Sequence, residues 1–137
     1  MTCLPLIFGE FVIDCSRAAR EAGLKSVMVT AGYITPAARA EVFRNIDGAN
    51  VDLKAFTERF YHKLTFSHLD PVLDTLRWLK YETDIWFEIT NLVIPNWNDN
   101  EEDVRALVDW APAPLPPNVE TAVFRIAQEA VNNVARH

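Results

Sequence analysis

The sequence predicts an α/β fold built on a parallel sheet, and three observations support this class. Short β-branched, apolar runs alternate along the chain with segments of helical character. The order is helix, strand, helix, strand, helix, strand, helix, and such alternation implies βαβ units and a parallel sheet. The chain has 137 residues, of which 50% are hydrophobic and 23% are charged, so it is long enough and apolar enough for a globular core.

The first half of the chain predicts two helices and two strands. Residues 14–23, "DCSRAAREAG", read as a helix that a glycine closes. Residues 25–34, "KSVMVTAGYI", hold a β-branched apolar run and predict a strand. Residues 36–46 begin with proline, which suits the first turn of a helix, and residues 49–56 are the next predicted strand.

The next part of the chain continues the alternation. Thr57 and Glu58 begin a short predicted helix, and residues 69–82 form a longer one with apolar residues at helical spacing. Residues 84–95 predict a third strand, and residues 99–110 a helix with acidic residues in its first turn, where the helix dipole favours them. Three strands are too few for a closed eight-stranded barrel, and their sheet would have two open edges. We therefore expect the sheet to be part of something larger, with another chain as one way to complete it.

The composition changes after Trp110. Residues 111–117, "APAPLPP", contain four prolines and predict a stiff linker. Residues 118–137 predict one amphipathic helix. The sequence thus divides into an α/β part (residues 1–110), a proline-rich linker (111–117) and a helical segment (118–137).

Charge and composition exclude several classes of function. The net charge is −6 and the isoelectric point is about 5.0, whereas a nucleic-acid-binding surface would be basic. No run of about 18 apolar residues is present, so we expect no membrane span. The first ten residues lack a basic leader, and two cysteines are too few for a disulfide framework. These features predict a cytoplasmic protein.

Polar residues stand at the ends of all three predicted strands, where parallel α/β folds place their sites. Side chains two residues apart on a strand share a face, so Asp52 can pair with Lys54, and Glu88 shares a face with Thr90. Spacing alone leaves two readings of the Asp52–Lys54 pair. It is either a binding group for a carboxylate, an amine or a ribose, or a structural ion pair that seals one end of the fold.

Three stretches resemble a known family. They are "PLIFGEFVIDCSRAAREAGLKSVMVTAGYI", "IDGANVDLKAFTERFYHKL" and "EITNLVIPNWNDNEED". In this order they resemble the middle of a radical S-adenosylmethionine enzyme of the pyruvate-formate-lyase-activating-like branch, particularly the AmmeMemoRadiSam system proteins. The resemblance covers about residues 5–110. It implies a partial TIM-like barrel with about three parallel strands, which binds S-adenosylmethionine at its mouth. In the family, a [4Fe–4S] cluster cleaves this cofactor reductively to a 5′-deoxyadenosyl radical.

The resemblance also implies which residues contact the small-molecule cofactor. Asp52 and Lys54 match the family's D-x-K motif, and "VTAG" corresponds to a turn near the ribose. Asn96 replaces a glycine in the stretch that borders the adenine. The residues assigned to the S-adenosylmethionine side are Thr30, Gly32, Asp52, Lys54, Glu88, Thr90 and Asp99.

The cluster-binding motif of the family is missing from this sequence. The family holds its cluster with three cysteines in a C-x3-C-x2-C motif, and iron–sulfur clusters need thiolate ligands. Cys3 and Cys15 are twelve residues apart and do not fit this spacing. Leu4 precedes Pro5 where the family has an acid that binds the cofactor's amino group. We therefore expect a fragment of such an enzyme that is inactive as written, and we leave open whether the chain is an enzyme.

A second resemblance covers the end of the chain. "LPPNVETAVFRIAQEAVNNVARH", residues 115–137, resembles the ATP-binding N-box helix of sensor histidine kinases of the NarX/LuxR-linked type. It implies a part of an Mg-ATP site, with Glu129 and Asn133 on one helix face; an amide oxygen is a suitable Mg²⁺ ligand. The alternatives to the first function are therefore a fragment of a two-component sensor kinase and a non-catalytic fusion product.

Overall fold

The computed structural model describes residues 8–110, which divide into two compact units. Of these residues, the first unit contains 8–53 and 67–91, and the second contains 54–66 and 92–110. The predicted linker and the predicted helix over 118–137, with Glu129 and Asn133, lie outside the described residues. So do Cys3, Leu4 and Pro5.

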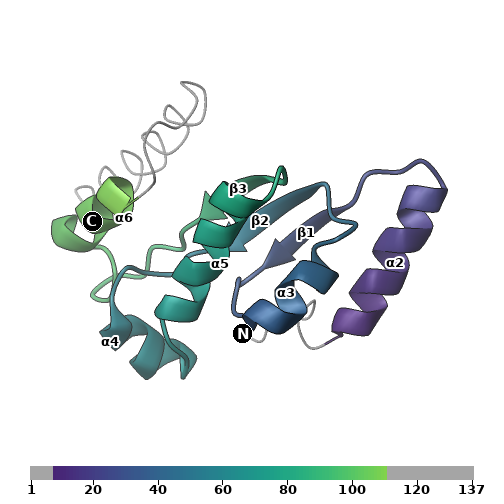
Figure 1. Ribbon diagram of the computed structural model, residues 1–137. Helices are drawn as coiled ribbons and strands as arrows, with labels where there is room; N and C mark the ends of the chain where they lie inside the picture. Colours follow the sequence, from purple (N-terminus) through teal and green to yellow (C-terminus); the bar gives the residue numbers. More distant parts are fainter. Residues whose placement is uncertain (1–7, 111–137) are drawn as a thin grey trace. The chain divides into compact units, whose positions relative to one another are not determined.

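The first unit contains a parallel sheet of three strands (Figure 1). The strands are β1 (Val27–Thr30), β2 (Gly48–Asp52) and β3 (Trp86–Thr90), in the order β1-β2-β3. Val27 lies opposite Gly48 at one end of the sheet, and Asp52 lies opposite Thr90 at the other. The predicted α/β class with three parallel strands is confirmed.

Helices cover one face of this sheet. Figure 1 shows α3 (Pro36–Val42) and α5 (Asp70–Glu82) on this side of the strands, and α2 (Gly9–Glu21) packs against α3. Apolar side chains of the strands, of the residues next to them and of α5 are buried there. Each Å² of apolar surface removed from water stabilises the fold by about 25 cal/mol. The buried set includes Met28, Ala49, Val51, Leu53, Val72, Leu76 and Leu79.

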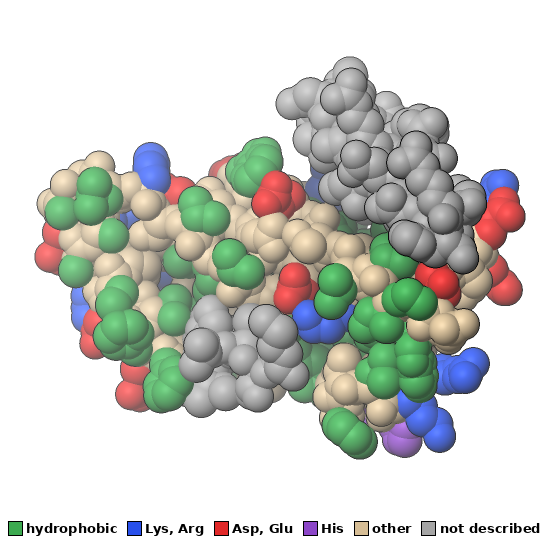
Figure 2. All heavy atoms as spheres, turned by 180° about the vertical axis from the view of Figure 1, so that it is seen from behind, with side chains coloured by type: hydrophobic (Ala, Val, Ile, Leu, Met, Phe, Trp, Pro, Cys, Tyr) green, Lys and Arg blue, Asp and Glu red, His purple; other side chains and the backbone are tan. Residues whose placement is uncertain are grey.

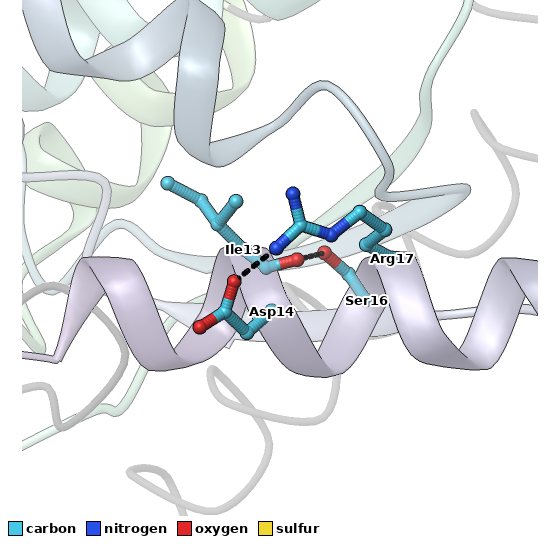
Figure 3. Close-up of polar contacts among 4 residues, drawn as sticks. All are labelled: Ile13, Asp14, Ser16 and Arg17. Carbon is cyan, nitrogen blue, oxygen red and sulfur yellow. Dashed lines mark hydrogen bonds and ion pairs between the residues drawn. The ribbon is translucent and has the colours of Figure 1, made fainter.

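Helix α2 begins five residues before its predicted start at Asp14. The N–H of Val12 already donates to the carbonyl of Phe8, so the first turn forms upstream of the polar segment. Within α2, the Ser16 hydroxyl donates to the carbonyl of Ile13 at 3.0 Å, and Asp14 pairs with Arg17 (Figure 3). The helix predicted over residues 14–23 therefore begins too late.

The strands and α3 are shorter than the sequence predicts. The run over residues 25–34 forms strand only at Val27–Thr30, because Gly32 turns the chain with a φ of 66°. The run over residues 84–95 forms strand only at Trp86–Thr90. Helix α3 ends at Val42, and the next residues form turns that lead to β2. An apolar residue beyond the end of a helix can therefore be buried without extending the helix. Ile46, which follows α3, is an example.

The second unit is built around two short helical segments. Helix α4 (Glu58–Phe60) begins after Thr57 as predicted and continues as a π-helix, η1 (Tyr61–Thr65). Helix α6 (Glu101–Trp110) is the second segment. The ring of Phe56 lies 5.7 Å from that of Trp110, and the ring of Phe60 lies 6.4 Å from that of Trp97. The first contact joins the segment before α4 to α6, and the second joins the loop after residue 92 to α4.

Candidate functional site

The sheet face opposite the helices is open in the first unit. Alternate strand residues on this face are exposed: Val27 by 68%, Val29 by 59% and Trp86 by 60%. Figure 2, which views the chain from behind Figure 1, shows separate hydrophobic side chains among polar ones on that side. We call this surface, with Val27, Val29, Asn50, Asp52, Trp86, Glu88 and Thr90, the open face.

A hydrogen-bonded cluster of three polar side chains lies on the open face. The Asn50 amide donates from Nδ2 to Glu88 Oε1 at 2.6 Å and to Thr90 Oγ1 at 2.8 Å. The Thr90 hydroxyl in turn lies 3.1 Å from Asn50 Oδ1. The parallel register sets Asn50 opposite Glu88, which brings these side chains together across β2 and β3. The cluster therefore fixes the carboxylate of Glu88 on the open face.

The carboxyl ends of β2 and β3 are held together beyond the last strand residues. The N–H of Leu53 donates to the carbonyl of Thr90 at 3.0 Å, and the Asn91 amide donates to the carbonyl of Leu53 at 2.7 Å. Asp52 is half-buried and lies opposite Thr90 in this register. The structure thus brings three predicted site residues, Asp52, Glu88 and Thr90, to one face of one sheet end.

Sequence reasoning missed Asn50, which connects Glu88 to Thr90. A signal was present, because Asn50 stands two residues before Asp52 and must share its face if the stretch is a strand.

Thr30 and Gly32 lie on the other side of the sheet. The Thr30 side chain is fully buried, and its hydroxyl oxygen accepts the N–H of Gly32 at 3.1 Å. Gly32 adopts a φ of 66°, and a Cβ there would lie 3.0 Å from Val51 Cγ1 and 3.5 Å from Val72 Cγ1. In this structure both residues shape the turn after β1 and pack beneath it.

The second unit holds the two other predicted residues, Lys54 and Asp99. The N–H of Lys54 donates to the hydroxyl of Tyr61 at 3.2 Å, and its carbonyl accepts from Asn98 Nδ2 at 2.6 Å. Asn98 is 3% exposed, and the neighbouring Asp99 is half-buried. Asn96 has a φ of 66°, a conformation that glycine and asparagine adopt most readily, so asparagine is a suitable replacement for glycine at this position.

An exposed ion pair lies at the opposite end of the sheet, where β1 and β2 begin. Lys25 Nζ lies 2.7 Å from Asp47 Oδ1, and the N–H of Ser26 donates to Asp47 Oδ2 at 2.9 Å. The Lys25 hydrogen bond, and then that of Ser26, hold the pKa of the Asp47 carboxyl below its ordinary value.

Residues 8–110 do not provide the ligand set of an iron–sulfur cluster. No group of three histidine, cysteine, aspartate or glutamate side chains that could hold a metal ion occurs within them. Their single cysteine, Cys15, is exposed on α2, and the whole sequence contains two cysteines, fewer than a three-thiolate motif requires. Among the described helices, none has both the length and the hydropathy to cross a membrane.

Comparison with solved structures shows the fold of the chain. No protein-family model matches the chain. An uncharacterised protein of Methanocaldococcus jannaschii, MJ0808, is 38% identical over 104 residues, which is 76% of this chain and 30% of the relative, so the chain spans under a third of that protein's length. A crystal structure of a domain of pyruvate-formate lyase-activating enzyme from Bacteroides vulgatus matches with a TM-score of 0.73 and 18% identity, over 94% of this chain and 88% of the domain. The chain therefore shares its fold with a domain of a pyruvate-formate lyase-activating enzyme.

Proposed function

We propose that this chain is the S-adenosylmethionine-binding part of a radical S-adenosylmethionine enzyme. The observation that carries the proposal is the cluster of Asn50, Glu88 and Thr90, with Asp52 beyond it, at the carboxyl end of the open face. Two further lines support it. The fold matches a domain of an activating enzyme, and the motifs around Asp52 resemble the same family.

The chemistry of the open face suits this cofactor. S-adenosylmethionine offers ribose hydroxyls and an ammonium group as donors, together with a positive sulfonium, and carboxylates accept such donors strongly. We assign the ribose hydroxyls to Glu88, whose orientation is fixed by Asn50, and the cationic groups to Asp52. The exposed ring of Trp86 lies against Gly48, and it offers an aromatic surface for the adenine on the same face.

The remaining predicted residues fill different roles in the proposal. Thr30 and Gly32 shape the turn after β1 and act on the cofactor only through that turn. Lys54 and Asp99 are assigned to the same ligand by the sequence resemblance. The proposal is limited to binding, because the described residues do not fit the cluster that supplies the electron for cleavage in the family.

Titration of the purified chain with S-adenosylmethionine by isothermal calorimetry tests this proposal. We expect saturable binding that Glu88→Gln weakens about tenfold, because the substitution removes a charge-assisted acceptor without changing shape. Glu82→Gln is the matched control, since Glu82 is exposed at the end of α5 and lies outside the open face. Absence of binding, or equal loss in both variants, would overturn the proposal. Saturable binding of Mg-ATP in its place would support the kinase alternative.

A further inference from the structure

The backbone of Lys54 is held on both sides by side chains of the second unit. Its N–H donates to the Tyr61 hydroxyl at 3.2 Å, and its carbonyl accepts from the Asn98 amide at 2.6 Å. These two partners are 7 and 44 residues away along the chain. Both are buried, Tyr61 with 3% and Asn98 with 3% of its surface exposed. Two buried side chains therefore fix one peptide segment immediately after a strand exit.

Asn98 uses its whole amide group in this arrangement. Nδ2 donates to the carbonyls of Lys54 and of Leu92 at 2.6 and 2.9 Å, and Oδ1 accepts the N–H of Ile94 at 2.6 Å. Asparagine is the shortest side chain that presents two donors and an acceptor on one neutral planar group. Asn98 thus attaches the loop from Leu92 to Asn98 directly to Lys54.

Tyr61 stands at the point where the helix widens. Helix α4 changes there into the π-helix η1, a form that often occurs at functional sites. The carbonyl of Tyr61 accepts from the Thr65 hydroxyl at 2.7 Å, and its ring contacts that of Phe60. The Thr65 hydroxyl thus holds the backbone of Tyr61, and Phe60 packs against its ring, so that the Tyr61 hydroxyl holds a defined position for the N–H of Lys54.

We propose that Tyr61 and Asn98 are positioning residues for Lys54: they hold its backbone so that its ammonium group meets a bound anionic or carboxylate ligand group. Fixing a lysine side chain costs about 2 kcal/mol of conformational entropy. If the backbone is already rigid, less ordering remains to be done when the ligand binds, so the free energy of binding is more favourable. Under the proposed function, on which this inference rests, the ligand group is the carboxylate of S-adenosylmethionine.

The test measures the ¹³C NMR signal of the Lys54 amine after reductive methylation of the lysines of the chain. The sequence contains four lysines, Lys25, Lys54, Lys63 and Lys80, so the Lys54 signal can be assigned by substitution. Tyr61→Phe removes one oxygen and keeps the ring. We expect the Lys54 signal alone to shift and sharpen in this variant, and S-adenosylmethionine to bind about threefold to tenfold more weakly.

The matched control is Thr75→Val, which removes a hydrogen bond of the same kind, from the Thr75 hydroxyl to the carbonyl of Pro71, in α5 of the first unit. It should leave the Lys54 signal in place. If Tyr61→Phe does not fold, Asn98→Asp is the second test variant. The aspartate keeps the acceptor for the N–H of Ile94 and loses both donors to the carbonyls of Lys54 and Leu92. Amide hydrogen exchange of Lys54 in the unaltered chain provides a reading that needs no variant, and slow exchange is expected.

The outcomes separate the inference from the proposed function. A Lys54 signal that does not change in Tyr61→Phe or Asn98→Asp would overturn the inference even if S-adenosylmethionine binds. The expected change in the unliganded chain, together with no binding of S-adenosylmethionine, would support positioning of Lys54 and overturn the proposed ligand.

Discussion

At the scale of single residues, Gly32 is a position where the first unit has no room for a side chain. Its φ of 66° disfavours any L-residue with a Cβ, and the nearest atom to such a Cβ, Val51 Cγ1, would be 3.0 Å away. Gly23 has a similar φ of 73°, but nothing lies within 4 Å of its Cβ position. The two glycines thus separate the cost of backbone conformation from the cost of close packing.

We predict that Gly32→Ala destabilises the chain more than Gly23→Ala does. The Gly23 substitution should lower the free energy of unfolding by about 1 kcal/mol, the cost of a left-handed conformation at alanine. The Gly32 substitution should lower it by a further 1–2 kcal/mol or so, because the added methyl group overpacks the turn against Val51. Urea denaturation of both variants measures the difference. Equal losses would show that the turn accommodates the added methyl group beside Val51.

The same turn shows what the sequence could not predict about the site. Thr30 was predicted to line the cofactor site because it stands at the end of a strand. However, β1 carries apolar residues on both faces. Val27 and Val29 are exposed while Met28 is buried, so hydropathy does not reveal which face Thr30 joins. For β2 the alternation was informative: Ala49, Val51 and Leu53 are buried, and Asp52 is directed to the other face.

At the scale of elements, α3 and α5 are joined through a buried arginine. Arg39 of α3 is 6% exposed, and its Nη1 lies 2.7 Å from Asp74 Oδ2 on α5. Its guanidinium lies 4.9 Å from the centre of the Trp78 ring, and its Nε is buried without a hydrogen-bond partner. The arginine therefore depends on Asp74 and on Trp78 to compensate for the loss of water around its charge.

We predict that removing Asp74 costs more stability than removing Arg39. Asp74→Ala leaves the guanidinium buried and unpaired, and it should lower the free energy of unfolding by about 1–3 kcal/mol. Arg39→Met replaces the charge with an apolar chain of similar length and leaves Asp74 exposed to water, so its cost should be below about 1 kcal/mol. Thermal and urea unfolding of the two variants measure both values. The reverse order would show that the ion pair is a net source of stability.

The boundaries of the elements depend on contacts that a single sequence does not display. Helix α2 starts at Gly9 within an apolar stretch, and its end is marked by Gly23, which the sequence does indicate. Helix α5 was predicted within one residue because Pro71 lies in its first turn and its apolar residues keep a helical period. The chain continues from Tyr61 as a π-helix, and no pattern in the sequence predicted this.

At the scale of the whole molecule, the fold class was predictable and the division into two units was not. The βαβ alternation requires a parallel sheet, and the three strands form one in sequence order. The boundary after Leu53 falls inside the D-x-K motif, between Asp52 and Lys54, where the sequence suggested one continuous strand. The pairing of Leu53 with Thr90 and Asn91 ends the sheet there, and this depends on residues almost forty positions away.

The open face allows a prediction about which side of the sheet is covered in the intact chain. Val27 and Val51 are chemically identical, but Val27 is 68% exposed and Val51 is 0% exposed. Replacement of valine by threonine exchanges a methyl for a hydroxyl group of nearly the same size. In the buried position the hydroxyl loses water without a prepared partner, so Val51→Thr should lower the free energy of unfolding by about 1–3 kcal/mol. Val27→Thr should change it by less than about 0.5 kcal/mol, because the hydroxyl stays hydrated.

Urea denaturation over a range of protein concentrations measures both values. A large cost at Val27 that grows with concentration would mean that a second copy covers the open face. A large cost independent of concentration would mean that part of the same chain covers it. With neither, the face on which Asp52 and Glu88 stand is accessible to a small ligand.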